Sequence, residues 1–129
     1  MVLGAVTQEP IRAVGDVFVI SMQSRKWGLY EIDNYVVEYE PDRLIGWEPQ
    51  AGRGHPNAGK PRLGHRWSYR LSPDGDGATV VTETYDCSRA PADERAAMDN
   101  GQMWAGAMAD TLARLEAVCL AAAQHDKSG

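Results

Sequence analysis

The chain has 129 residues, a net charge of −5 and a hydrophobic fraction of 43%. This size and composition indicate one globular domain. The absence of a basic block disfavours nucleic acid and anionic membrane surfaces as partners. No apolar run reaches the roughly 18 residues of a membrane helix, and the N-terminus lacks signal-peptide features, so we expect no membrane insertion and a cytoplasmic location.

Residues 1 to 15 contain glycines and a proline and show no period, which predicts an irregular lead-in. From residue 16 to residue 86 the pattern changes to strands separated by turn residues. The expected strands are 16–22, 27–40, 44–47, 63–71 and 79–86. Consecutive strands joined mostly by short turns indicate an antiparallel meander. The Gly- and Pro-rich segment 49–62 predicts a long loop, either a functional lid or a mobile segment.

The last two strands alternate in an unusual way. His65, Trp67, Tyr69 and Leu71 fall on one side of the first strand. On the second strand, one face carries Thr79, Val81, Glu83 and Tyr85. An ordinary core would use Val, Ile and Leu, so these side chains either line a cavity or face water. The sequence does not say which face is concave, and a shift of one residue would reverse the faces.

Residues 93–123 are rich in Ala, Leu and Met and predict a C-terminal helix. Six residues recur at helical spacing and form one stripe: Trp104, Met108, Leu112, Leu115, Cys119 and Ala122. We expect this stripe to be buried against one face of the sheet. A gap between a curved sheet and such a helix is a place where apolar ligands bind.

The segments GDVFVISM, YVVEYEPDRLIGW, GHRWSYRLSPDGDGATVVTETYD and MADTLARLEAV follow one another in the order of a known family. Together they resemble the SRPBCC superfamily, also called START-like or polyketide cyclase/dehydrase-like proteins. The resemblance covers residues 14 to about 123 and implies an α+β helix-grip fold, in which a curved antiparallel sheet packs on a long C-terminal helix. It also implies a cavity for lipids, sterols, aromatic polyketides or hormones. It carries no catalytic residue to this chain.

Members of this superfamily usually have an edge strand and one or two short helices before the segment that matches GDVF. Only 15 residues precede Asp16 here, so by comparison the chain is expected to be N-terminally short. An open sheet edge would follow, and a partner chain, such as a second copy in a homodimer, would cover it.

The expected ligand-binding wall combines the two strands with the start of the helix: Trp67, Tyr69, Val81, Glu83, Tyr85, Trp104, Met108 and Leu112. Aromatic side chains offer area to an apolar ligand and, for Trp and Tyr, a polar tip that orients it. The alternative is that they are ordinary core packing. Glu83 and His65 are the weak candidates for general acid–base work. The alternatives are that Glu83 is solvated or paired with Arg66 or Arg70, and that His65 has one hydrogen bond at a strand end.

No pair of histidines has metal-ligand spacing, so we expect no metal and no cofactor. Cys87 and Cys119 match no zinc or redox motif; their spacing is compatible with a disulfide, but two free thiols are favoured. The first functional hypothesis is binding of a small apolar molecule. The alternatives are a polyketide cyclase or dehydratase-type enzyme and a homo-oligomeric interaction module.

Overall fold

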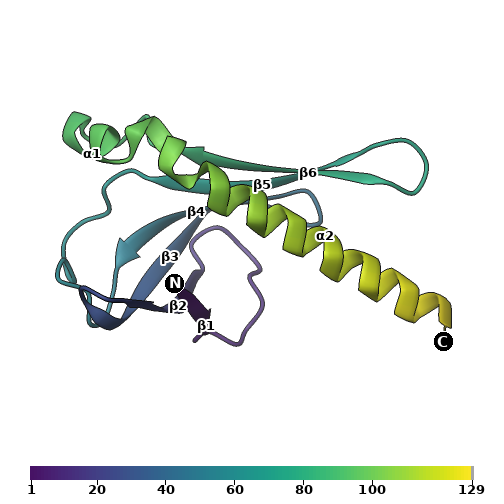
Figure 1. Cartoon of the computed structure of the whole chain (residues 1–129), viewed down its shortest axis with the longest axis horizontal. Helices are drawn as coiled ribbons and strands as arrows, with labels where there is room; N and C mark the ends of the chain where they lie inside the picture. Colours follow the sequence, from purple (N-terminus) through teal and green to yellow (C-terminus); the bar gives the residue numbers. More distant parts are fainter. Residues whose placement is uncertain (129) are drawn as a thin grey trace.

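A six-stranded antiparallel sheet forms the body of the protein, and a long helix crosses it (Figure 1). The structure is a computed structural model that describes the backbone of residues 1–128 and the surroundings of side chains through residue 124. The strands lie side by side in sequence order: β1 (Val2–Ala5), β2 (Val17–Ser24), β3 (Gly28–Glu40), β4 (Leu44–Ala51), β5 (Arg66–Pro73) and β6 (Thr79–Asp86).

The predicted fold class is confirmed. The sheet is an antiparallel meander that curls into a half-barrel, and the C-terminal helix lies across it (Figure 1). Each strand pairs with the next along the chain. Short turns join β2 to β3, β3 to β4 and β5 to β6, whereas residues 6–16 and 52–65 form longer connections before β2 and β5. The architecture is α+β and agrees with a helix-grip-like arrangement.

The irregular lead-in predicted for residues 1–15 is wrong at its beginning, where β1 pairs with the edge of β2. Val2 lies opposite Met22 and Ala5 lies opposite Ile20. Between these pairs the register shifts at Gly4, whose φ is 155°. A bulge of this kind interrupts the two-residue alternation by which a strand is recognised in a sequence.

The single helix predicted for residues 93–123 is divided into three pieces. They are α1 (Ala92–Ala97), the 3-10 helix η1 (Asp99–Trp104) and α2 (Ala105–Ser128). The break lies at Asn100 and Gly101, whose φ angles of 51° and 93° are in the left-handed region. A Cβ atom on Gly101 would stand 2.9 Å from Cδ2 of Tyr85, so the glycine permits both the turn and a close approach to the sheet.

The fully buried residues are few. Tyr30, Asn34 and Val36 are buried along β3, and Cys87 and Ala90 are buried where β6 leads into α1. Two glycines, Gly46 and Gly52, are buried as well. The Asn34 side-chain amide donates hydrogen bonds to two backbone carbonyl oxygens, which satisfies its burial beside Val36. Most other large apolar residues that face α2 remain half-exposed.

The loop of residues 52–65 packs against the β2–β3 hairpin and against the outer face of the sheet, which is the face turned away from α2. The ring centroids of Trp27 and His55 are 4.5 Å apart, and burial lowers the pKa of His55. Nearer the end of the loop, the Arg62 guanidinium lies 4.8 Å from the ring centroid of Tyr35. The Arg62 contact lies on the face of the sheet away from α2, whereas His55 also packs on the ring of Tyr30, with centroids 5.3 Å apart, on the same face as Phe18. The interpretation of this loop as a lid stays a prediction.

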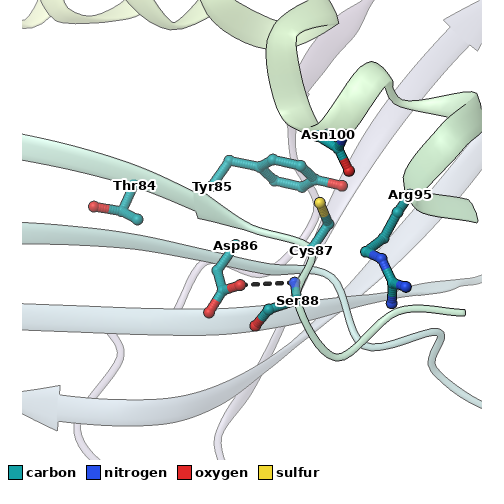
Figure 2. A pocket seen from close by; sticks show the side chains of 7 residues that line it. All are labelled: Thr84, Tyr85, Asp86, Cys87, Ser88, Arg95 and Asn100. Carbon is teal, nitrogen blue, oxygen red and sulfur yellow. Dashed lines mark hydrogen bonds between the residues drawn. The ribbon is translucent and has the colours of Figure 1, made fainter. Parts of the chain in front are cut away.

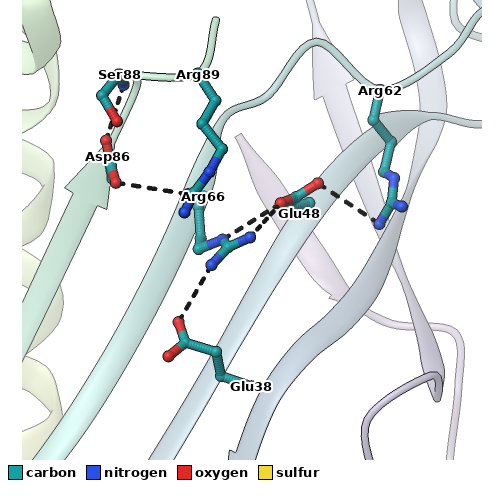
Figure 3. Close-up of polar contacts among 7 residues, drawn as sticks. All are labelled: Glu38, Glu48, Arg62, Arg66, Asp86, Ser88 and Arg89. Carbon is teal, nitrogen blue, oxygen red and sulfur yellow. Dashed lines mark hydrogen bonds and ion pairs between the residues drawn. The ribbon is translucent and has the colours of Figure 1, made fainter.

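Charged side chains organise the outer face of the sheet around Arg66 (Figure 3). The Arg66 guanidinium donates to Glu48 at 2.8 Å and lies 3.6 Å from a carboxylate oxygen of Glu38. Arg62 pairs with the second oxygen of Glu48 at 3.6 Å. The Glu48 side chain is only 13% exposed, so these interactions are less screened by water than an ordinary surface pair.

We expect Glu48→Gln to lower the free energy of unfolding by about 1–3 kcal/mol, because two arginines lose a half-buried charged partner. The matched control is Glu40→Gln, which removes an exposed pair with Arg43 and is expected to cost at most about 1 kcal/mol. Urea unfolding of both variants measures the difference. Equal losses would show that the outer-face cluster does not stabilise the sheet.

Candidate functional site

The register between β5 and β6 places the predicted wall residues directly opposite one another. Trp67 faces Tyr85, Tyr69 faces Glu83, and Leu71 faces Val81. Opposite residues of an antiparallel pair project from the same face of the sheet. The predicted alternation on both strands is therefore confirmed, and we call this side the inner face.

The start of the long helix lies on the inner face. The Trp104 ring packs edge-on against Trp67, with centroids 5.5 Å apart, and lies 6.1 Å from Tyr85. Trp67 and Tyr85 are themselves 4.7 Å apart. Three aromatic rings from β5, β6 and η1 thus form one cluster, which settles which sheet face the helix covers.

The predicted helical stripe is only partly covered. Trp104, Met108, Leu112 and Leu115 are half-buried, but Cys119 and Ala122 are exposed. The expectation that the whole stripe is buried is wrong for these last two positions. The reason is geometrical: α2 approaches the sheet mainly at β6 and then extends past the strands (Figure 1).

Two aromatic residues that the sequence analysis did not select extend the inner face toward the other edge of the sheet. Trp47 of β4 stacks on Tyr69 at 5.7 Å, and Phe18 of β2 meets Trp47 edge-on at 5.5 Å. Trp47 is paired with Trp67 in the sheet. The alternation within each strand was visible in the sequence, but only the pairing of strands joins these residues into one surface.

Tyr69 and Glu83 form a hydrogen-bonded pair on this surface. The Tyr69 hydroxyl donates to Oε2 of Glu83 at 2.9 Å. Burial is the main cause that raises the pKa of Tyr69, and the hydrogen bond to Glu83 and the charge of Glu83 raise it further. The phenol therefore stays protonated at neutral pH and remains a donor. Pairing with Arg66 or Arg70 does not occur, because both lie opposite residues of the other face.

The second carboxylate oxygen of Glu83 is buried and has no hydrogen-bond partner among the described residues. The indole Nε1 of Trp104 is also buried and lacks full hydrogen-bond geometry there, but it interacts with the Tyr85 hydroxyl and lowers the pKa of that phenol, against the larger effect of burial. Buried polar atoms without a partner are uncommon in folded proteins and call for an explanation. Here one acceptor, Oε1 of Glu83, remains unsatisfied on an otherwise aromatic surface.

His65 lies between Tyr85 and Glu94, a residue of α1 that the sequence analysis did not select. Its Nδ1 is 2.5 Å from the Tyr85 hydroxyl, and its Nε2 is 3.4 Å from Oε2 of Glu94. Burial is the main cause that raises the pKa of Tyr85, so this phenol is also a donor at neutral pH. In the neutral tautomer that fits these distances, Nδ1 accepts from Tyr85 and Nε2–H points to the Glu94 carboxylate.

Two shallow, open hollows of the surface lie beside the wall rather than over it. One of about 520 Å³ opens where β6 ends near α1 (Figure 2). It is lined by Thr84, Tyr85, Asp86, Cys87, Ser88, Arg95 and Asn100. Another of about 210 Å³ lies between residues 7–11 and the start of β2. Of the predicted wall, only Tyr85 lines either hollow.

Within the described residues, no group of three or more His, Cys, Asp and Glu side chains is arranged to hold a metal ion. None of the helices described in the structure combines the length and apolar character needed to cross a membrane.

Comparisons of the chain with protein-family models, with curated proteins and with solved structures found no match. The similarity to the SRPBCC superfamily stays a prediction from the sequence pattern. The residues of the inner face are therefore the basis for any functional proposal.

We expect Tyr69→Phe to lower the free energy of unfolding by about 1–3 kcal/mol, because the Glu83 carboxylate loses its only hydrogen-bond donor among the described residues. Glu83→Leu in the Tyr69→Phe background should recover much of this loss, since no buried charge is then left unpaired. A double-mutant cycle by urea unfolding measures the coupling. Additive effects of the two substitutions would contradict a stabilising pair.

Proposed function

We propose that the inner face binds a small apolar molecule, of lipid, aromatic or polyketide-like chemistry. The contact surface is the wall predicted from the sequence, together with Trp47. The predicted wall residues are Trp67, Tyr69, Val81, Glu83, Tyr85, Trp104, Met108 and Leu112. The observation that carries the proposal is the unsatisfied buried oxygen Oε1 of Glu83, which lies on an aromatic surface.

A ligand would relieve two costs at once. A buried polar atom without a partner costs about 1–3 kcal/mol, which a ligand hydroxyl donating to Glu83 would recover. The half-exposed rings of Trp67 and Tyr69 would lose contact with water at roughly 25 cal/mol per Å² of apolar area, before the costs of association. The favoured ligand is therefore apolar over most of its surface and carries one hydrogen-bond donor.

Two probes of nearly the same shape test this chemistry. We expect 2-naphthol to bind more tightly than 2-methylnaphthalene, because only the first can donate to Glu83. Tryptophan fluorescence and native mass spectrometry measure binding, and mass spectrometry also reports any adduct retained through purification. Glu83→Gln should reduce the preference for the hydroxyl compound.

Trp67→Ala should weaken binding of 2-naphthol by at least about tenfold, because the centre of the ring cluster is lost. Trp27→Ala is the matched control: Trp27 is another partly exposed tryptophan, but it lies at the β2–β3 hairpin away from the wall. Equal affinity in both variants, or no binding of either probe, would refute the proposal.

The second candidate function is an enzyme of the polyketide cyclase or dehydratase type. It is favoured by the contacts among Glu94, His65 and Tyr85. The Glu94 carboxylate orients the His65 imidazole, which contacts the Tyr85 phenol. Such an arrangement suits general acid–base catalysis, since the imidazole takes up or releases a proton while the carboxylate fixes its tautomer. Glu83 is the other group that could move a proton.

Incubation with a synthetic poly-β-keto thioester tests this candidate. Cyclisation with dehydration produces a product lighter by one water, which mass spectrometry detects. We expect His65→Gln to reduce the rate by about 10²–10⁴-fold, the usual contribution of a general acid or base, while naphthol binding is retained. Unchanged turnover in both His65→Gln and Glu83→Ala would contradict the enzymatic function and leave ligand binding standing.

A further inference from the structure

The protein exposes more surface than a compact chain of its mass. The accessible surface is 9011 Å² for 14.1 kDa. A folded monomer of this mass is expected to expose about 6,700 Å². The surplus is roughly 2,300 Å², whereas a stable protein–protein interface removes about 800 Å² from each partner and obligate dimers remove more.

Part of the exposed apolar surface lies in the C-terminal half of α2. Residues 117–123 read AVCLAAA, a stretch without a polar side chain, which we call the apolar helix end. All of these residues are exposed, and Val118 and Leu120 retain 66% and 57% of their accessible surface. Val118 and Leu120 point to nearly opposite sides of the helix. A helix that is apolar on all sides is normally buried in protein.

The sheet of the same chain does not cover the apolar helix end. α2 meets the sheet mainly at β6, and in Figure 1 its C-terminal half runs beyond the strands. The inner face at β2, meanwhile, keeps Phe18, Ile20 and Met22 half-exposed. Each chain thus has one projecting apolar helix and one incompletely covered apolar face.

We propose that a second copy of this chain covers the apolar helix end, in a two-fold dimer in which each α2 packs on the other copy. A two-fold contact is self-complementary, so the projecting helix of each copy and the uncovered face of its neighbour are satisfied together. The apolar helix end offers no charge by which a different partner would be selected. Its four alanines allow two helices to approach closely. This proposal does not depend on ligand binding.

Light scattering after size-exclusion chromatography tests the proposal directly. We expect wild-type protein to have twice the chain mass of 14.1 kDa and to dissociate on dilution. Val118→Glu and Leu120→Glu should each raise the dimer Kd by at least about tenfold, because each places a charge in an apolar contact. Both positions are exposed in the single chain, so far-UV circular dichroism of the variants should match the wild type.

Leu29→Glu is the matched control. Leu29 is as exposed as Val118, at 66%, but it lies at the β2–β3 hairpin, so this variant should remain a dimer. Dissociation of the control to the same extent would overturn the proposal, as would a wild-type monomer at every concentration. Copurification of a different protein in stoichiometric amount would overturn it as well.

Cys119 gives an independent readout within the apolar helix end. It is exposed in the single chain, whereas Cys87 is buried. In the dimer, Cys119 should react slowly with a thiol reagent, and its rate should rise at least about tenfold on dilution or in Val118→Glu. A fast rate that is independent of concentration would contradict burial of this segment by a second copy.

Discussion

The contact between Gly101 and the ring of Tyr85 determines how the helical part of the chain meets the sheet. The left-handed residues Asn100 and Gly101 lie between α1 and α2. They change the direction of the backbone, so that α2 runs across β6. Because glycine has no side chain, the turn lies directly against the aromatic ring. Trp104 follows three residues later and reaches Trp67 and Tyr85. Without this close approach the aromatic cluster would lack its third ring.

The same junction brings together the polar groups of the candidate site. Tyr85 contacts Gly101 through its ring and His65 through its hydroxyl, and His65 in turn faces Glu94 of α1. Side-chain contacts from a carboxylate to an imidazole to a phenol can hold α1 against the sheet, which is a structural tether. The same contacts can also transfer a proton. What favours a functional role on the inner face is the unsatisfied buried oxygen of Glu83, since a tether between His65 and Tyr85 gives no reason for it.

The ligand proposal and the dimer proposal both start from the small number of buried residues. A chain with so few fully buried residues and so much half-exposed aromatic surface has apolar area still to be covered. The ligand proposal concerns the ring cluster near β5 and β6, and the dimer proposal concerns the apolar helix end and the face near β2. The ring cluster and the face near β2 belong to one sheet, whereas the apolar helix end belongs to α2.

The sequence pattern predicted the strands β2 to β6, the helical character of the C-terminal third and the residues that share a face of β5 and β6. These properties follow from periodicity, which a chain carries whatever its partners are. The pattern missed the end of β4, which runs to Ala51 inside the segment expected to be a loop. Tertiary structure decided the rest. The bulge in the pairing of β1 with β2, the hydrogen bond of Tyr69 to Glu83 and the pairing of His65 with Glu94 depend on distant segments meeting. The exposure of Cys119 likewise depends on where α2 leaves the sheet, because no local pattern records how far a helix extends beyond the surface it covers.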